Sequence, residues 1–229
     1  ANVTAQVIDP GKLKAILFDL DGTLVDTADE FVVVVQALRA EHGMGAMDAR
    51  RIRASVSNGA RALVALGLGI AEGEPAFEDK RLRLLELYSE VLGSAAKPYP
   101  GIPPLLAELE ARGIGWGIAT NKPRAYAAPL MEALGLHPPC GSLVCPDDVK
   151  ERKPHPESLY RNCRELNCAP HEAIYIGDHL RDIEAGRRAG MATVAAAYGY
   201  IEPDDDPHSW GADALVDCSK QLSDLIFNS

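Results

Sequence analysis

Two aspartates two positions apart end the first apolar run of the chain. Asp19 and Asp21 close the segment KAILFDLD (14–21), and residues i and i+2 of an extended chain point to the same side. Two carboxylates in one pocket repel each other unless one stays protonated or a cation lies between them, and Mg²⁺ takes carboxylate and phosphate oxygens. Gly22 permits a sharp exit, and Thr23 offers a hydroxyl and a backbone N–H. The pattern predicts a magnesium site, although Asp-Gly is also a common acidic turn.

A second acidic pair follows a later apolar run. Asp178 comes directly after residues 172–177, and Asp182 lies about one helical turn further on, so both carboxylates can approach one site. Either residue could instead be the N-cap of the following helix. Because two separate runs each end in paired carboxylates, we favour the metal interpretation.

Anion-binding groups follow two further runs. Thr120, Asn121 and Lys122 supply a hydroxyl, an amide and free N–H groups where an anion would bind. Lys153 precedes Pro154, which fits the first turn of a helix. A lone lysine is usually solvated, but here its charge would balance four carboxylates and an anionic substrate.

The segments that position these residues alternate between strand-like and helix-like patterns. Apolar runs predict six strands, at 14–20, 114–120, 142–145, 172–177, 191–197 and 213–216. Helical runs between them end at Gly113, Gly135 and Gly190, which suit C-terminal caps. The alternation predicts an α/β fold, with a Rossmann-like parallel sheet covered by helices on both faces. In such sheets function gathers at the carboxyl ends of the strands, where the groups above lie.

Residues 25–95 break the alternation, because they read as helices only. Thr27 and Glu30 form a capping-box pattern at the first of these helices. We therefore expect an inserted all-helical cap domain (25–95) above the strand ends of a catalytic α/β core (1–24 and 96–229).

A polar break, SNGAR (57–61), separates two of the predicted cap helices. Such a loop could reach the pocket and contact the end of a substrate that lies away from the acidic pairs. Arg61 could pair with a substrate carboxylate there. A solvent-facing helix start is an equally good interpretation of the same residues.

Composition narrows the class of protein. The 229 residues carry a net charge of −10 and no basic block, which argues against nucleic acid or an anionic membrane as partner. No apolar stretch approaches the roughly 20 residues of a membrane helix, and we find no signal-peptide pattern. The five cysteines fit no zinc pattern. We expect a cytoplasmic protein with reduced, structural thiols.

Four segments together resemble the motifs of the haloacid dehalogenase superfamily of phosphotransferases. In chain order they are DLDGTLVDT, ATNKP, RKPHPESL and GDHLRDIEAGRRAGM. A single DxDxT would be a weak signal, but the ordered set is highly specific and covers the predicted core. The predicted helical insertion matches the cap domain of that family in position and size.

The resemblance implies a Mg²⁺-dependent phosphomonoester hydrolase. Asp19 would be the nucleophile that forms an aspartyl-phosphate, and Asp21 the general acid and base. Mg²⁺ would be held by Asp19, the backbone carbonyl of Asp21, and Asp178, with Asp182 supporting Lys153 or a bound water. Phosphoryl and substrate contacts would come from Thr23, Thr120, Asn121, Lys122, Lys153 and, in the cap, Arg61.

Within the superfamily, the chain is similar to phosphoglycolate phosphatase-like proteins, and most of all to the branch of N-acetylmuramic acid 6-phosphate phosphatases in cell-wall recycling. Three segments outside the motifs carry this likeness, at 57–64, 145–150 and 198–217. This likeness implies that the substrate is a small phosphorylated metabolite, either N-acetylmuramic acid 6-phosphate or 2-phosphoglycolate. It also implies that the protein is a monomer or a homodimer. A sugar phosphomutase and a catalytically silent regulatory relative are the alternatives. An acid at Asp21 argues against dehalogenases and phosphonate-cleaving relatives.

Overall fold

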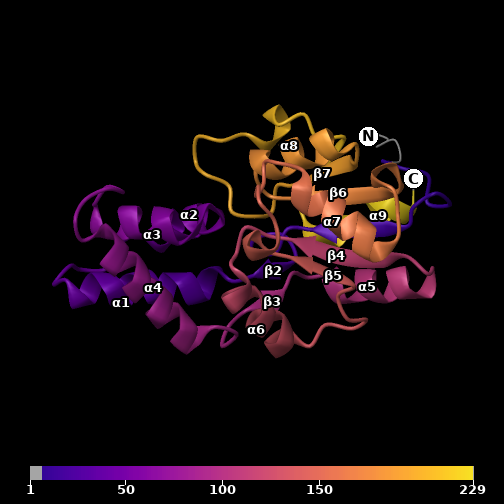
Figure 1. Ribbon diagram of the computed structural model, residues 1–229. Helices are drawn as coiled ribbons and strands as arrows, with labels where there is room; N and C mark the ends of the chain where they lie inside the picture. The colour runs from indigo at the N-terminus through magenta and orange to yellow at the C-terminus, as the bar shows by residue number, and fades with distance from the viewer. Residues whose placement is uncertain (1–6, 229) are drawn as a thin grey trace.

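The computed structural model describes residues 7–228 and contains a six-stranded parallel sheet (Figure 1). The strand order is β5-β4-β1-β6-β7-β8. The strands are β1 (Ala15–Phe18), β4 (Gly115–Ala119), β5 (Ser142–Val144), β6 (Ala173–Gly177), β7 (Ala192–Ala196) and β8 (Ala214–Val216). Each lies within a run that the sequence predicts as a strand, so the α/β fold class is confirmed.

The central position of β1 explains why its sequence is apolar throughout. All four of its residues are buried, because helices cover both faces of a parallel sheet. Its last residue, Phe18, is aligned with Ile118 of β4 and with Ile176 of β6. Parallel strands in this register end at one edge, so the residues that follow these three positions emerge side by side.

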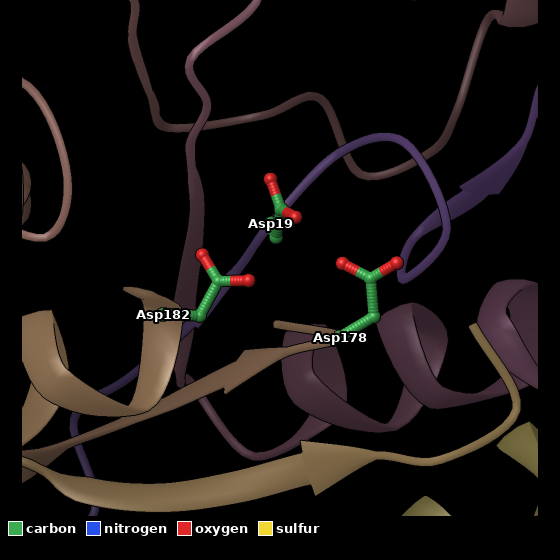
Figure 2. A group of neighbouring side chains, drawn as sticks. All are labelled: Asp19, Asp178 and Asp182. Atoms are coloured by element: carbon green, nitrogen blue, oxygen red, sulfur yellow. The ribbon is translucent and has the colours of Figure 1, made fainter. Parts of the chain in front are cut away.

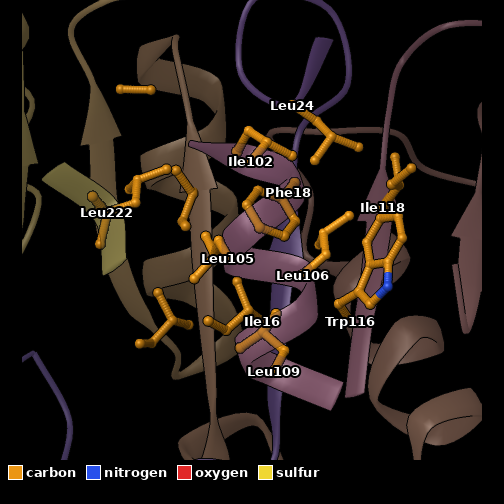
Figure 3. Close-up of a cluster of buried hydrophobic side chains, with 14 of the residues drawn as sticks. Ile16, Phe18, Leu24, Ile102, Leu105, Leu106, Leu109, Trp116, Ile118 and Leu222 are labelled. Atoms are coloured by element: carbon orange, nitrogen blue, oxygen red, sulfur yellow. The ribbon is translucent and has the colours of Figure 1, made fainter. Parts of the chain in front are cut away.

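Helices cover the sheet on both faces. They are α5 (Ile102–Ala111), α6 (Arg124–Leu134), α7 (Glu157–Leu166), α8 (Leu180–Ala189) and α9 (Leu222–Phe227). On one face, Phe18 and Trp116 pack against leucines of α5 such as Leu106 (Figure 3). On the other face, Tyr175 packs in a separate cluster with Leu159 of α7. Short 3-10 helices lie in the connections: η1 (Val56–Asn58), η2 (Pro146–Asp148), η3 (Pro170–Glu172), η4 (Pro207–Ser209) and η5 (Ser219–Gln221).

Four helices fill the predicted insertion and lie to one side of the sheet (Figure 1). They are α1 (Ala28–Glu41), α2 (Ala49–Ser55), α3 (Gly59–Leu68) and α4 (Phe77–Val91). They share an apolar cluster of their own, which includes Phe31, Leu38 and Tyr88. At their base, β2 (Val25–Asp26) pairs antiparallel with β3 (Lys97–Pro98), a two-residue ladder that the sequence did not predict. We keep the interpretation of this segment as a cap domain.

The predicted capping box at Thr27 and Glu30 is wrong. Thr27 occupies the N-cap position of α1, but its side chain makes no capping bond and instead donates to Asp21 Oδ1 at 2.6 Å. Glu30 Oε2 accepts from the backbone N–H groups of Ala95 and Ala96, at 2.8 and 2.9 Å. Tertiary partners have replaced the local ones, and the carboxylate links the two ends of the cap segment.

Two further helix starts differ from expectation. Pro154 does not open a helix, because α7 begins at Glu157. The N-cap of α8 is His179, whose side chain accepts from the backbone N–H of Arg181. Neither Asp178 nor Asp182 therefore caps this helix. Both acidic side chains remain available for other partners.

Two of the five cysteines, Cys145 and Cys163, are buried in the core. All five carry free thiols, as predicted. Burial raises the pKa of both Cys145 and Cys163 to about 12, so neither forms a reactive thiolate near neutral pH. Within residues 7–228, no helix combines the length and apolar character that crossing a bilayer requires.

Candidate active site

Three buried carboxylates from distant parts of the chain meet at the carboxyl edge of the sheet. Oxygens of Asp19, Asp178 and Asp182 all lie within 4.8 Å of one another. Figure 2 shows them facing a common space: Asp19 follows β1, Asp178 follows β6, and Asp182 comes from the first turn of α8. The predicted convergence of these side chains is therefore present in the structure.

Lys153 lies beside this cluster and is also buried. Its Nζ donates to Asp182 Oδ1 at 2.7 Å and to Asp19 Oδ1 at 3.1 Å. The Ala119 carbonyl and the Tyr175 hydroxyl also lie within hydrogen-bond distance of Nζ, at 2.8 and 2.7 Å, so four acceptors surround its three N–H groups. Burial alone would lower the pKa of Lys153, but Asp182 and Asp19 raise it above its ordinary value. Asp19 and Asp182 therefore keep Lys153 protonated, and the lysine in turn orients both carboxylates.

Burial and mutual repulsion perturb the carboxyl groups. Burial and then the charge of Asp182 raise the pKa of Asp19 well above its usual value, and the same two causes raise the pKa of Asp178 to about 6. Burial would raise the pKa of Asp182 too, but Lys153 lowers it below its ordinary value. Three ionised carboxylates so close together require more positive charge than one lysine supplies.

The donor set fits a hard divalent cation. Asp178 Oδ1 and Asp182 Oδ2 are buried and have no hydrogen-bond partner among residues 7–228. Buried oxygens without partners are costly; a magnesium ion held by Asp19 and Asp178 would supply a partner to Asp178 directly and to Asp182 through a bound water.

Asp21 points its carboxylate toward the cap rather than into the cluster. Its Oδ1 accepts from Thr27 Oγ1 at 2.6 Å and from Lys122 Nζ at 2.9 Å. Lys122 also donates to the hydroxyl of Tyr88 in α4, at 2.5 Å, and lies over that ring. Lys122, a predicted substrate contact, therefore joins Asp21 to the cap in this structure.

The remaining predicted core contacts take different positions. Thr120 is buried, and its Oγ1 accepts from the backbone N–H of Lys122 at 3.0 Å. Asn121 Nδ2 donates to the carbonyl of Lys153 at 3.2 Å. Both residues line the pocket described below, whereas Thr23 is fully buried and does not.

A pocket of about 470 Å³ opens above these groups, between the core and the cap. Asp19, Asp21, Thr120 and Lys153 form its core end. The cap contributes Phe31, Val56, Ser57, Asn58, Gly59, Ala60, Arg61, Arg81, Leu85 and Tyr88. The structure thus brings Arg61 to the same pocket, where it pairs with Glu72 at 2.7 Å.

A set of contacts between cap and core escaped the sequence analysis. Ser57 Oγ donates to Asp178 Oδ2 at 2.7 Å. Arg181 in α8 donates to the Ser57 carbonyl at 2.8 Å and to Asn58 Oδ1 at 2.6 Å. The polar break predicted at 57–61 was the only sequence feature that pointed to these contacts, because residues so far apart in the chain form no local sequence pattern.

Two glycines make room for Asp178. Gly22 has φ +83°, and a Cβ there would lie 2.2 Å from Asp178 Oδ2. A Cβ at Gly199 would lie 2.3 Å from the Asp178 Cβ. Because no side chain fits at these distances, only glycine lets the loop after β1 and the loop after β7 close around this carboxylate.

Comparisons with known proteins identify the family of the chain. The family model for haloacid dehalogenase-like hydrolases matches residues 16–196. An N-acetylmuramic acid 6-phosphate phosphatase of Pseudomonas aeruginosa is 47% identical, over 94% of this chain and 95% of that one. A phosphoglycolate phosphatase of Xanthomonas campestris pv. campestris is 40% identical, over 91% and 94%.

Solved structures share the fold. The crystal structure of a predicted phosphoglycolate phosphatase from Haemophilus somnus 129pt superposes with a TM-score of 0.82 at 24% identity, over 93% of this chain and 98% of that one. The family model and the two curated relatives each cover most of the chain. The chain therefore belongs to the haloacid dehalogenase-like hydrolase family and is a phosphatase.

Proposed function

We propose that this phosphatase hydrolyses N-acetylmuramic acid 6-phosphate, with Mg²⁺ as cofactor and through a phosphorylated Asp19. The observation that carries the proposal is the buried group of Asp19, Asp178, Asp182 and Lys153, of which Asp19 and Lys153 line a pocket of about 470 Å³. A nucleophile, a cation site and a fixed ammonium group are the parts that phosphoryl transfer requires.

In the first half-reaction, a carboxylate oxygen of Asp19 attacks phosphorus, and the bond from phosphorus to the sugar oxygen breaks. Asp21 donates a proton to that departing oxygen. Lys153 and Thr120 hold the phosphoryl oxygens as negative charge spreads over them. The products of this step are the free alcohol and an acyl phosphate on Asp19.

In the second half-reaction, water attacks the same phosphorus atom. Asp21, now ionised, takes a proton from that water, the acyl phosphate bond breaks, and Asp19 is regenerated as a carboxylate. Thr27 and Lys122 orient Asp21 through its Oδ1.

We assign the magnesium ligands to Asp19, the backbone carbonyl of Asp21, and Asp178. When bound, the ion would neutralise charge on the carboxylates and on the phosphoryl oxygens. Asp182 would act mainly on Lys153, since its Oδ1 is engaged there at 2.7 Å. The unpartnered Asp178 Oδ1, among the described residues, supports this assignment.

The size and lining of the pocket favour the larger of the two candidate substrates. The two-carbon chain of 2-phosphoglycolate would leave most of about 470 Å³ to water. Phe31, Tyr88 and Tyr126 line the space beyond the phosphoryl end, and aromatic rings give a sugar an apolar face to pack on. The Pseudomonas relative, 47% identical, points to the same sugar phosphate.

The second candidate substrate is 2-phosphoglycolate, favoured by the name of the Xanthomonas relative. Arg61 stays a proposed substrate contact from the cap; it would have to exchange Glu72 for the substrate. We also keep the predictions of a cytoplasmic enzyme of cell-wall recycling that acts as a monomer or homodimer.

A substrate panel tests the proposal. Purified protein is assayed for phosphate release from N-acetylmuramic acid 6-phosphate, 2-phosphoglycolate and other phosphorylated metabolites, with Mg²⁺ and with EDTA. We expect the highest kcat/KM for N-acetylmuramic acid 6-phosphate and no turnover in EDTA. Isomerised phosphosugar without free phosphate would instead indicate a mutase, and no reaction with any substrate would indicate a silent relative.

A further inference from the structure

Six cationic side chains line the pocket, but the chain supplies few anions there. They are Arg61, Arg81, Lys122, Arg152, Lys153 and Arg181, whereas the acidic residues of the lining are Asp19 and Asp21. A cation that lines a pocket can bind an anionic ligand when it is not already paired. Which cations already have partners then decides which of them is free to bind one.

Five of the six are engaged by the protein itself. Lys153 pairs with Asp19 and Asp182, and Lys122 with Asp21. In the cap, Arg61 pairs with Glu72, and Arg81 with Glu78. The two NH groups of Arg181 donate to the loop of Ser57 and Asn58.

Arg152 is the exception. Within residues 7–228, its guanidinium makes no hydrogen bond or ion pair, although it lines the pocket. Its backbone is well anchored: the Arg152 carbonyl accepts from the backbone N–H of His155 at 3.1 Å, and the next carbonyl, of Lys153, accepts from Asn121 at 3.2 Å. Arg152, which has no side-chain partner among residues 7–228, therefore lies on the same core loop as Lys153.

We propose that Arg152 is a specificity-determining residue that binds the carboxylate of the substrate. The phosphoryl end already has Lys153 and Thr120, so a guanidinium outside it is suited to a second anionic group. A planar guanidinium binds a carboxylate through two parallel hydrogen bonds. The inference rests on the proposed function: in N-acetylmuramic acid 6-phosphate this group is the lactyl carboxylate.

The position of Arg152 on the core has a consequence for selectivity. Arg61 and Arg81 belong to the cap, so their distance from Asp19 depends on how the cap lies. Arg152 is adjacent in sequence to Lys153, whose Nζ lies 3.1 Å from Asp19. The spacing between the phosphoryl site and the carboxylate site is therefore set by one loop.

A matched pair of substrates isolates this contact. N-acetylglucosamine 6-phosphate differs from N-acetylmuramic acid 6-phosphate only by lacking the lactyl ether. For Arg152→Met we expect kcat/KM for N-acetylmuramic acid 6-phosphate to fall about 10- to 100-fold, the usual effect of losing a charged hydrogen bond. For N-acetylglucosamine 6-phosphate it should change less than about threefold. Arg152→Lys should recover part of the loss.

Arg51→Met is the control, because Arg51 is an exposed arginine of α2 that does not line the pocket. This substitution removes the same charge and should leave kcat/KM unchanged for both substrates. A binding measurement avoids catalysis: in the Asp19→Asn background with Mg²⁺, Arg152→Met should raise the Kd for N-acetylmuramic acid 6-phosphate by the same factor.

Three outcomes overturn the inference. Equal losses on both substrates would place Arg152 at the phosphoryl group, no loss on either would make it a surface residue, and the same loss in Arg51→Met would reduce the effect to net charge. The proposed function fails differently, when the unmodified enzyme does not hydrolyse N-acetylmuramic acid 6-phosphate at all.

Discussion

The two ends of the pocket are built in opposite ways. At the core end, Lys153 and three carboxylates are buried and bonded to groups from several strand ends. At the cap end, the pairs Arg61–Glu72 and Arg81–Glu78 lie at the surface. Buried charges hold their geometry strongly, whereas exposed pairs contribute about 0–1 kcal/mol and exchange partners readily. The core end is suited to holding the reacting groups in fixed positions, and the cap end to rearranging its contacts around different substrates.

Asp19→Asn should produce the largest effect, because it removes the nucleophile from the fixed end. We expect kcat/KM to fall by about 10⁴-fold or more for every substrate, with no loss of thermal stability, since an amide relieves the repulsion among buried carboxylates. Steady-state phosphate release and thermal unfolding measure the two quantities. The control is Asp217→Asn, an exposed aspartate that is not part of the pocket lining. Full activity of Asp19→Asn would refute the assignment.

Lys153→Met should be the most destabilising change, because it leaves Asp19 and Asp182 buried without their cation. Removing one partner of a buried pair costs about 3–5 kcal/mol, which urea unfolding in EDTA would measure. The double variant Lys153→Met/Asp182→Asn should recover stability but not activity. If the single variant is as stable as the unmodified protein, the ammonium group does not hold the core end together.

Mg²⁺ should stabilise the protein by an amount that depends on pH. At 100 times its Kd, a ligand adds about 2.7 kcal/mol. The pKa of Asp178 is raised to about 6, so the metal-free folded protein binds more protons than the unfolded chain, and it loses stability as pH rises from about 4 to about 6. Mg²⁺ competes with those protons.

Thermal unfolding with and without MgCl₂ checks this prediction. The increase in Tm on adding Mg²⁺ should be larger at about pH 7.5 than at about pH 5. EDTA should abolish it at both values. An increase that is equal at the two pH values would mean that the ion does not bind through the perturbed carboxylates.

Arg181→Met should have the smallest effect, and only at the cap end. It releases the carbonyl of Ser57 and the side chain of Asn58, so the cap loop should be held less firmly over the pocket. We expect KM for a sugar phosphate to rise about three- to tenfold, with kcat for p-nitrophenyl phosphate nearly unchanged. Arg188→Met, exposed on the same helix, is the matched control. A kcat loss on both substrates would mean that Arg181 serves the core end instead.

The difference between the core end and the cap end of the pocket also explains which features the sequence could predict. The four central strands, β4, β1, β6 and β7, are apolar runs because they are buried on both faces. The groups of the core end follow these runs directly, as Asp19 follows β1. The ladder of β2 and β3 was missed because Lys97 and Pro98 carry no strand signal. Thr27 and Glu30 were misread because their spacing suits a local cap, whereas their actual partners lie elsewhere in the chain.

The contacts of the cap end could not have been predicted. The bond from Ser57 to Asp178 joins two residues 121 positions apart, and no local pattern encodes such a partner. The sequence gives no signal for Arg152, because whether its side chain has a partner among residues 7–228 becomes visible only in the structure.

The most direct test of the central claim is chemical identification of the phosphorylated residue. Asp21→Asn protein is mixed with Mg²⁺ and p-nitrophenyl phosphate, whose good leaving group needs little protonation, so that the acyl phosphate accumulates because its hydrolysis is slowed. Borohydride reduces an aspartyl-phosphate to homoserine, which peptide mass spectrometry locates. The account predicts homoserine at position 19 and nowhere else. Release of p-nitrophenol with an unmodified Asp19 would contradict it.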